Sequence, residues 1–171
     1  MNRFLVITLA ATLAGAGVLR AQEAGPLSAE AKQAYTGIKN NLTRMAEKMP
    51  EEHYSFKPTP DVRTFGQLVA LVADAQARTC STVLGQPKAV DAASKTSKAD
   101  LVAALKEAFS ICDAAYNSLT DATAAQMITM GRAQRSKLGA LVSNTTHDNE
   151  EYGYMAVYLR LKGIVPPSSE R

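Results

Sequence analysis

The sequence has no tryptophan, and aromatic residues make up only 6% of its 171 residues. Runs of β-branched residues are also few, whereas alanine and leucine are abundant. Strands are built mainly from β-branched and aromatic residues, so this composition favours an all-α protein. The length fits a single domain with a proper hydrophobic core.

The chain also lacks a concentration of positive charge. It has 19 basic and 16 acidic residues, and the basic count falls to 17 when Arg3 and Arg20 in the N-terminal segment are set aside. No basic stripe, arginine-rich arm or aromatic platform remains. The sequence therefore predicts no nucleic-acid partner.

The N-terminus has the form of a targeting segment. Arg3 gives it a positive start, and residues 4–19 are almost wholly apolar. Small residues then offer cleavage points after Ala16 or after Ala21, and we predict a cleaved signal peptide over residues 1–21. An uncleaved anchor is the alternative, but this apolar run falls short of the ~20 residues that span a bilayer. Residues 22–171 are thus expected to be exported, periplasmic or secreted, with no membrane anchor after cleavage.

Only two cysteines are present, Cys80 and Cys112, and neither belongs to a C-x-x-C motif. In an oxidising compartment they can form a bridge between two helices. The alternative is a pair of small buried side chains with inert thiols.

Apolar residues recur at intervals of three and four over four long segments, residues 27–49, 65–84, 98–119 and 133–162. Three prolines, Pro50, Pro58 and Pro60, interrupt the helical pattern after the first segment. Residues 121–131 read as a loose connection before the last helix. Four long helices with at least one long crossover predict a four-helix bundle. The expected helix-end signals are Ser28, Thr64 with Gln67, Ser97 with Asp100, and Gly163.

The last segment carries His147 and Glu151 at positions i and i+4. On a helix this spacing places both side chains on one face. An imidazole and a carboxylate so placed can share a divalent metal or a proton. A polar surface patch near a helix end is the simpler interpretation of this pair.

Two strings carry a resemblance to a known family. They are Phe65-Gly-Gln-Leu-Val-Ala-Leu-Val-Ala-Asp-Ala-Gln76 and His147-Asp-Asn-Glu-Glu-Tyr-Gly153. Together they resemble the DinB/YfiT-like superfamily, over roughly residues 27–168. The chain is most similar to the exported branch, whose members end much like residues 158–168. The resemblance implies an all-α four-helix bundle with up-down-down-up, DinB-like topology over residues 22–171. It also implies a divalent metal, often zinc or nickel, held by three histidines.

The implied metal site is incomplete in this chain. His147 matches one histidine of the last helix, Glu151 takes the place of a second, and Leu71 takes the place of the histidine on the second helix. A carboxylate still binds metal, but leucine does not, so the site is one ligand short. Asp74, one turn after Leu71, is the best substitute, and Asp148 or Glu150 could approach from the last helix.

Two functions follow from the resemblance. One is an exported metal-dependent hydrolase or thiol transferase with a degenerate metal site at His147 and Glu151. The other is a non-catalytic helical bundle, a binding or stress-associated protein, that takes an unidentified small molecule without metal. A homodimer through one face of the bundle is compatible with either. The sequence assigns no catalytic residue.

Overall fold

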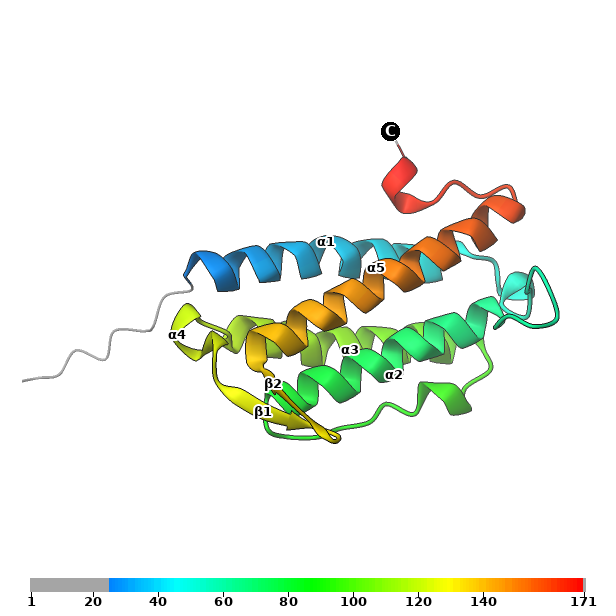
Figure 1. Cartoon of the computed structure of the whole chain (residues 1–171). Coiled ribbons are helices and arrows are strands. Elements are labelled where there is room, and N and C mark those ends of the chain that lie inside the picture. The colour runs from blue at the N-terminus through cyan, green and yellow to red at the C-terminus, as the bar shows by residue number, and fades with distance from the viewer. Residues whose placement is uncertain (1–24, 171) are drawn as a thin grey trace, which may run out of the picture.

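Four long helices form the body of the molecule, which the computed structural model describes over residues 25–170. The predicted signal peptide lies outside the described residues. In Figure 1 the first and last long helices run in one direction and the two middle ones in the other, which is the up-down-down-up order. The predicted all-α bundle is confirmed. The long helices are α1 (Pro26–Lys48), α2 (Phe65–Val83), α3 (Lys98–Ser118) and α5 (Lys137–Leu161).

Short elements join the long helices. The first link contains the turn η1 (Glu51–His53), and the crossover from α2 to α3 contains η2 (Ala92–Ser94). A single turn, α4 (Asp121–Ala124), follows α3, and η3 (Pro167–Ser169) follows α5. The crossover returns the chain along the bundle, so that α2 and α3 run parallel (Figure 1).

A β-hairpin before α5 was not predicted. Strand β1 (Met127–Met130) pairs antiparallel with β2 (Ala133–Ser136), with Met127 opposite Ser136. The expected start of the last helix at residue 133 was therefore wrong. The hydroxyl of Ser136 accepts a hydrogen bond from the backbone N–H of Gly139 at 3.0 Å and caps α5 there. The residues just before this cap pair with β1, because a strand partner satisfies their backbone groups before the helix begins.

Aromatic residues tie the helices together in the core. Tyr35 of α1 stacks on Tyr116 of α3 with ring centroids 4.0 Å apart. The Tyr116 hydroxyl donates to the carbonyl of Leu141 in α5 at 2.7 Å, and the Tyr35 hydroxyl donates to the carbonyl of Phe109 at 3.0 Å. Three of the four helices are thus fixed to one another around these two rings.

A disulfide joins α2 to α3 through Cys80 and Cys112, whose Cα atoms are 4.9 Å apart. Both residues are fully buried. Of the two alternatives for these cysteines, a disulfide or two free buried thiols, the structure has the disulfide. It fixes two parallel helices that are connected only through the long crossover.

Most helix ends lie at the residues that the sequence predicts. Thr64 and Gln67 form the predicted capping box at α2, and the Ser97 hydroxyl accepts from the N–H of Asp100 at α3. Gly163 has a φ of 73° and ends α5 as expected. Ser28 is not the N-cap of α1, which is Gly25, because the N–H of Ser28 donates to the Asp121 carboxylate at 2.8 Å.

Replacing Thr64 by Ala should lower the free energy of unfolding by about 1 kcal/mol, because the N–H of Gln67 loses its acceptor. Chemical denaturation measures the change. Thr59→Ala, in the exposed loop that precedes α2, is the matched control and should leave stability unchanged. An equal loss in both variants would contradict the assigned cap.

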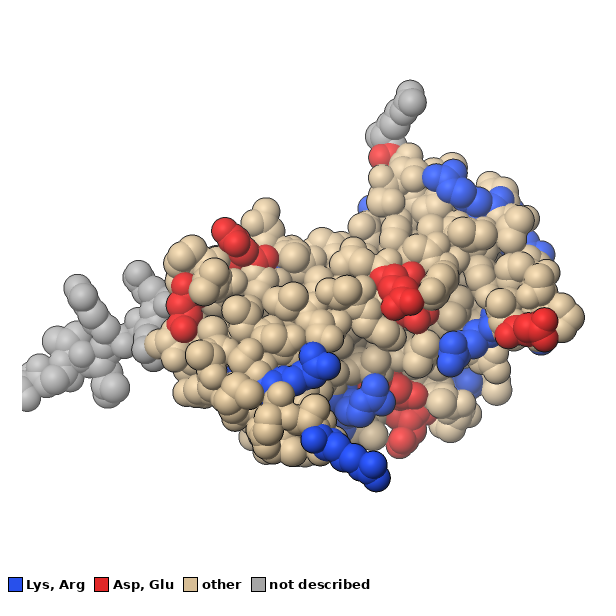
Figure 2. All heavy atoms as spheres, viewed as in Figure 1, with Lys and Arg blue, Asp and Glu red and all other residues tan. Residues whose placement is uncertain are grey.

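Charged side chains of both signs lie on the surface of the molecule. On the face shown in Figure 2, side chains of both signs are dispersed among wide uncharged areas. Within residues 25–170 no helix has the length and apolar character needed to cross a membrane. A functional site must therefore be located from specific side chains.

Candidate functional site

His147 and Glu151 lie one turn apart on α5, as predicted. Nε2 of His147 is 3.6 Å from Oε1 of Glu151, which is too long for a hydrogen bond. The His147 side chain is 32% exposed and that of Glu151 is 7% exposed. The helix thus presents an accessible imidazole above a nearly buried carboxylate, and the two are close but not bonded.

Both groups have polar atoms without a partner among the described residues. These atoms are Nδ1 of His147 and Oε2 of Glu151. A buried carboxylate oxygen is costly unless a hydrogen bond or a cation compensates it. The described residues thus leave two polar atoms of this pair available to a ligand.

Burial raises the pKa of Glu151, and the neighbouring Glu150 acts in the same direction. His147 and Arg63 act in the opposite direction, His147 more strongly than Arg63. Arg63 lies in the loop just before Thr64, the N-cap of α2. These two neighbours thus partly offset the cost of burying this carboxylate.

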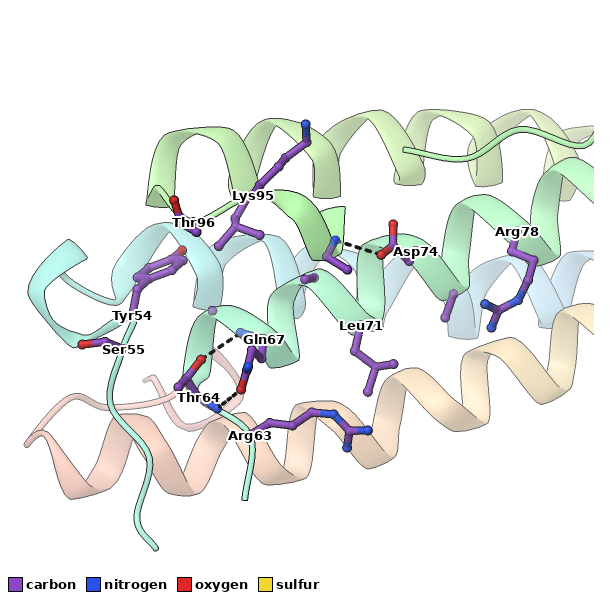
Figure 3. A pocket seen from close by; sticks show the side chains of 15 residues that line it. Tyr54, Ser55, Arg63, Thr64, Gln67, Leu71, Asp74, Arg78, Lys95 and Thr96 are labelled. Carbon is purple, nitrogen blue, oxygen red and sulfur yellow. Dashed lines mark hydrogen bonds between the residues drawn. The ribbon is translucent and has the colours of Figure 1, made fainter. Parts of the chain in front are cut away.

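The third position of the implied metal site is not filled. Leu71 lies on α2, partly buried, and Figure 3 shows its side chain directed toward α5. Asp74 is occupied elsewhere, since its oxygens accept from the backbone N–H groups of Ala92 and Ala93 at 2.8 and 3.0 Å. Within residues 25–170, no three His, Cys, Asp or Glu side chains gather closely enough to hold a metal.

The two further carboxylates considered for the third position point elsewhere. Glu150 is exposed and accepts a hydrogen bond from the hydroxyl of Tyr154 at 2.9 Å. Asp148 is fully buried and accepts from the side chain of Gln76. Neither completes a three-ligand set with His147 and Glu151.

Asp148 belongs to a polar cluster inside the bundle. Gln76 of α2 donates to Asp148 and accepts a hydrogen bond from the Asn144 side chain at 2.8 Å. The other oxygen of Asp148 has no partner among the described residues. Burial raises the pKa of Asp148 to about 8, with a smaller contribution from Glu151, while the Gln76 bond opposes the rise. The sequence interpretation did not single out Gln76, although a glutamine inside an apolar helix is a signal for such a cluster.

A cavity of about 650 Å³ opens beside Leu71 (Figure 3). Its lining includes Arg63 and Arg78, which the sequence interpretation also missed. Arg78 stands seven residues after Leu71, two helical turns on, and hence on the same face. That periodicity was the available signal for Arg78. Arg63 had none, because it lies in the loop before the helix.

The sequence profile described as the DinB superfamily matches residues 34–155. The chain belongs to the DinB superfamily. This match spans most of α1, all of α2 and α3, and most of α5, and so includes Leu71, His147 and Glu151. No curated protein matches the sequence.

Solved DinB-like structures share the bundle. A DinB-like protein from Bacillus cereus is 18% identical, with a TM-score of 0.68 over 80% of this chain and 93% of that one. A DinB-like protein from Bacillus subtilis is 20% identical, with a TM-score of 0.67 over 83% and 99% of the two chains. A third, from Exiguobacterium sibiricum, is 16% identical, with a TM-score of 0.57 over 82% and 95%. At these identities the likeness shows the fold.

Proposed function

We propose that this DinB-superfamily chain is a metal-dependent hydrolase or thiol transferase with a reduced metal site, in which His147 and Glu151 bind one divalent ion, zinc or nickel, weakly. The observation that carries the proposal is the 3.6 Å separation between Nε2 of His147 and Oε1 of Glu151. Two ligand atoms at about 2.1 Å from a tetrahedral zinc lie about 3.4 Å apart. The donor types and their spacing therefore suit two adjacent positions around one ion.

The chain's own residues have separate parts in this site. His147 offers Nε2 from the accessible side, and Glu151 offers a carboxylate whose second oxygen has no partner among the described residues. Leu71 leaves the α2 side apolar. When bound, the ion would act as a Lewis acid and lower the pKa of a coordinated water or thiol. The small-molecule substrate itself is not assigned.

A second candidate is a non-catalytic bundle that binds a small molecule without metal. Leu71 and the engagement of Asp74 by Ala92 and Ala93 favour it, because they leave only two donors. The two candidates differ in one measurable property, which is stoichiometric metal binding by His147.

Zinc titration of the untagged protein by calorimetry tests the proposal. We expect one ion per chain with a dissociation constant on the order of 10 µM, because each protein ligand contributes a few kcal/mol. His147→Ala should weaken binding at least about tenfold. The matched control is His53→Ala, the other histidine of the chain, which lies in η1 and should bind as the wild type does. Less than about 0.1 zinc per chain under excess zinc would favour the non-catalytic candidate.

We also propose that the protein is exported after removal of residues 1–21. The Cys80–Cys112 disulfide supports this, because structural disulfides persist in oxidising compartments. N-terminal sequencing of the protein recovered from the periplasm or medium should begin at Gln22. Recovery in the cytoplasm with residues 1–21 intact would contradict the proposal.

A further inference from the structure

The cavity beside Leu71 runs along α2, and Ala93, Lys95 and Thr96 of the crossover from α2 to α3 also line it. Leu71, Ala70 and Ala75 supply apolar surface, and Ala93 with Leu101 adds more from the crossover and α3. A volume of about 650 Å³ falls within the range of small-molecule sites. The cavity thus has the size and the apolar floor that a small organic molecule requires.

The residues that line this cavity include three cationic side chains and only one carboxylate. The cations are Arg63, Arg78 and Lys95, and the carboxylate is Asp74. Among residues 25–170, no carboxylate oxygen lies within 4.0 Å of any of the three cations. Asp74 is already compensated by two backbone N–H groups of η2. The cavity therefore holds an excess of positive charge that the described residues do not pair.

The two arginines stand on either side of Leu71. Figure 3 shows the side chains of Arg63, Leu71 and Arg78 all directed toward α5. The backbone of Arg63 is fixed, because its carbonyl accepts a hydrogen bond from the Tyr158 hydroxyl at 2.7 Å. The backbone of Arg78 is fixed by its position within α2, while its side chain is exposed. Along the cavity, the guanidinium of Arg63 is thus followed by the apolar side chain of Leu71 and then by the guanidinium of Arg78.

This order is complementary to an anion that carries negative groups at both ends of an apolar chain. We propose that the cavity binds a small aliphatic dicarboxylate, with one carboxylate on Arg63, the other on Arg78, and the methylene chain against Leu71 and Ala75. A planar guanidinium binds a carboxylate through two parallel hydrogen bonds. Lys95 adds positive charge on the crossover side. The proposed anion site uses neither His147 nor Glu151, although Arg63 also acts electrostatically on the Glu151 carboxylate.

Titration of the ¹⁵N-labelled full chain by NMR, with EDTA present and at low salt, tests this site without metal. The probe is adipate, and hexanoate and inorganic phosphate are the comparison anions. Adipate should shift the amides of residues 70–78 saturably, with a dissociation constant of about 1 mM. Hexanoate, which lacks the second carboxylate, and phosphate, which lacks the apolar chain, should each bind about tenfold more weakly.

Charge-removing variants locate the binding groups. Arg63→Gln and Arg78→Gln should each weaken adipate binding about tenfold, because one bidentate pair is lost. Arg132→Gln, at the hairpin turn, is the matched control and should bind as the wild type does. Adipate and phosphate binding with equal affinity, or an equal loss in all three variants, would overturn the proposal. So would the absence of saturable shifts in residues 70–78. Because EDTA removes metal, a negative result here leaves the metal titration unaffected, and the reverse also holds.

Discussion

Replacing Leu71 by His should tighten zinc binding about a hundredfold, since it would supply the third protein ligand. Leu71 is partly buried on α2, and its side chain is directed toward the helix that carries His147 and Glu151 (Figure 3). A third imidazole at this position would complete the number of protein ligands typical of catalytic zinc. Calorimetric zinc titration of the variant beside the wild type measures the gain.

Leu71→Gln is the control for this change. Glutamine removes the same apolar contact and adds polarity, but it is a poor zinc ligand. It should leave the zinc affinity within about twofold of the wild type, a difference well below the contribution of one ligand. A similar gain in both variants would show that loss of the leucine, and not a new ligand, changes the affinity. No gain in Leu71→His would mean that the α2 position does not face His147 and Glu151.

Replacing Asp148 by Asn should abolish most of the pH dependence of stability between about pH 4 and pH 8. Burial raises the pKa of Asp148 from 3.8 to about 8. Over this interval the unfolded chain releases the proton and the folded chain retains it, so the wild-type free energy of unfolding falls as the pH rises. Each pKa unit is worth about 1.4 kcal/mol, which gives a loss on the order of 5 kcal/mol by pH 8.

Asparagine at position 148 keeps the oxygen that accepts from Gln76 and has no charge to desolvate. The variant and the wild type should therefore have similar stability near pH 4, with the variant clearly more stable at pH 8. Urea denaturation with EDTA present, at several pH values, gives both curves. Asp61→Asn, in the exposed loop before α2, is the control and should follow the wild type. Parallel curves for wild type and Asp148→Asn would contradict a buried, protonated Asp148.

Much of the fold was predictable because its signals are local. Thr64 and Gln67 mark the start of α2, and Gly163 marks the end of α5, through contacts within one or two turns. The hairpin was missed because β1 and β2 are only four residues each, too short to show a strand period. The cap of α1 was missed for a different reason. It depends on Asp121, which is distant in the sequence and brought close only by the fold.

The candidate site was predictable only in part. The i, i+4 spacing of His147 and Glu151 places them on one helical face in any helix. The role of Asp74 depends on where the crossover returns, because its partners are backbone N–H groups of η2. Periodicity on α2 cannot locate that loop. The same is true of Arg63, whose position depends on a hydrogen bond from Tyr158 on the opposite helix.

The site lies on a rigid framework. The disulfide fixes α2 to α3, and the Gln76–Asn144–Asp148 cluster joins α2 to α5, with Asp148 next to His147 in the sequence. Buried, hydrogen-bonded groups of this kind hold α2 and α5 in a single arrangement. His147 and Glu151 themselves lie one turn apart on α5, so their backbone positions relative to each other are set by that helix.

The location of a bound ion tests the central claim most directly. Crystals of the wild-type protein soaked in zinc should show one anomalous peak per chain, within about 2.3 Å of both Nε2 of His147 and an oxygen of Glu151. The same soak of His147→Ala crystals should remove that peak. A peak that persists in His147→Ala crystals, or zinc found only at other residues of wild-type crystals, would contradict the assignment of His147 and Glu151 as the metal ligands.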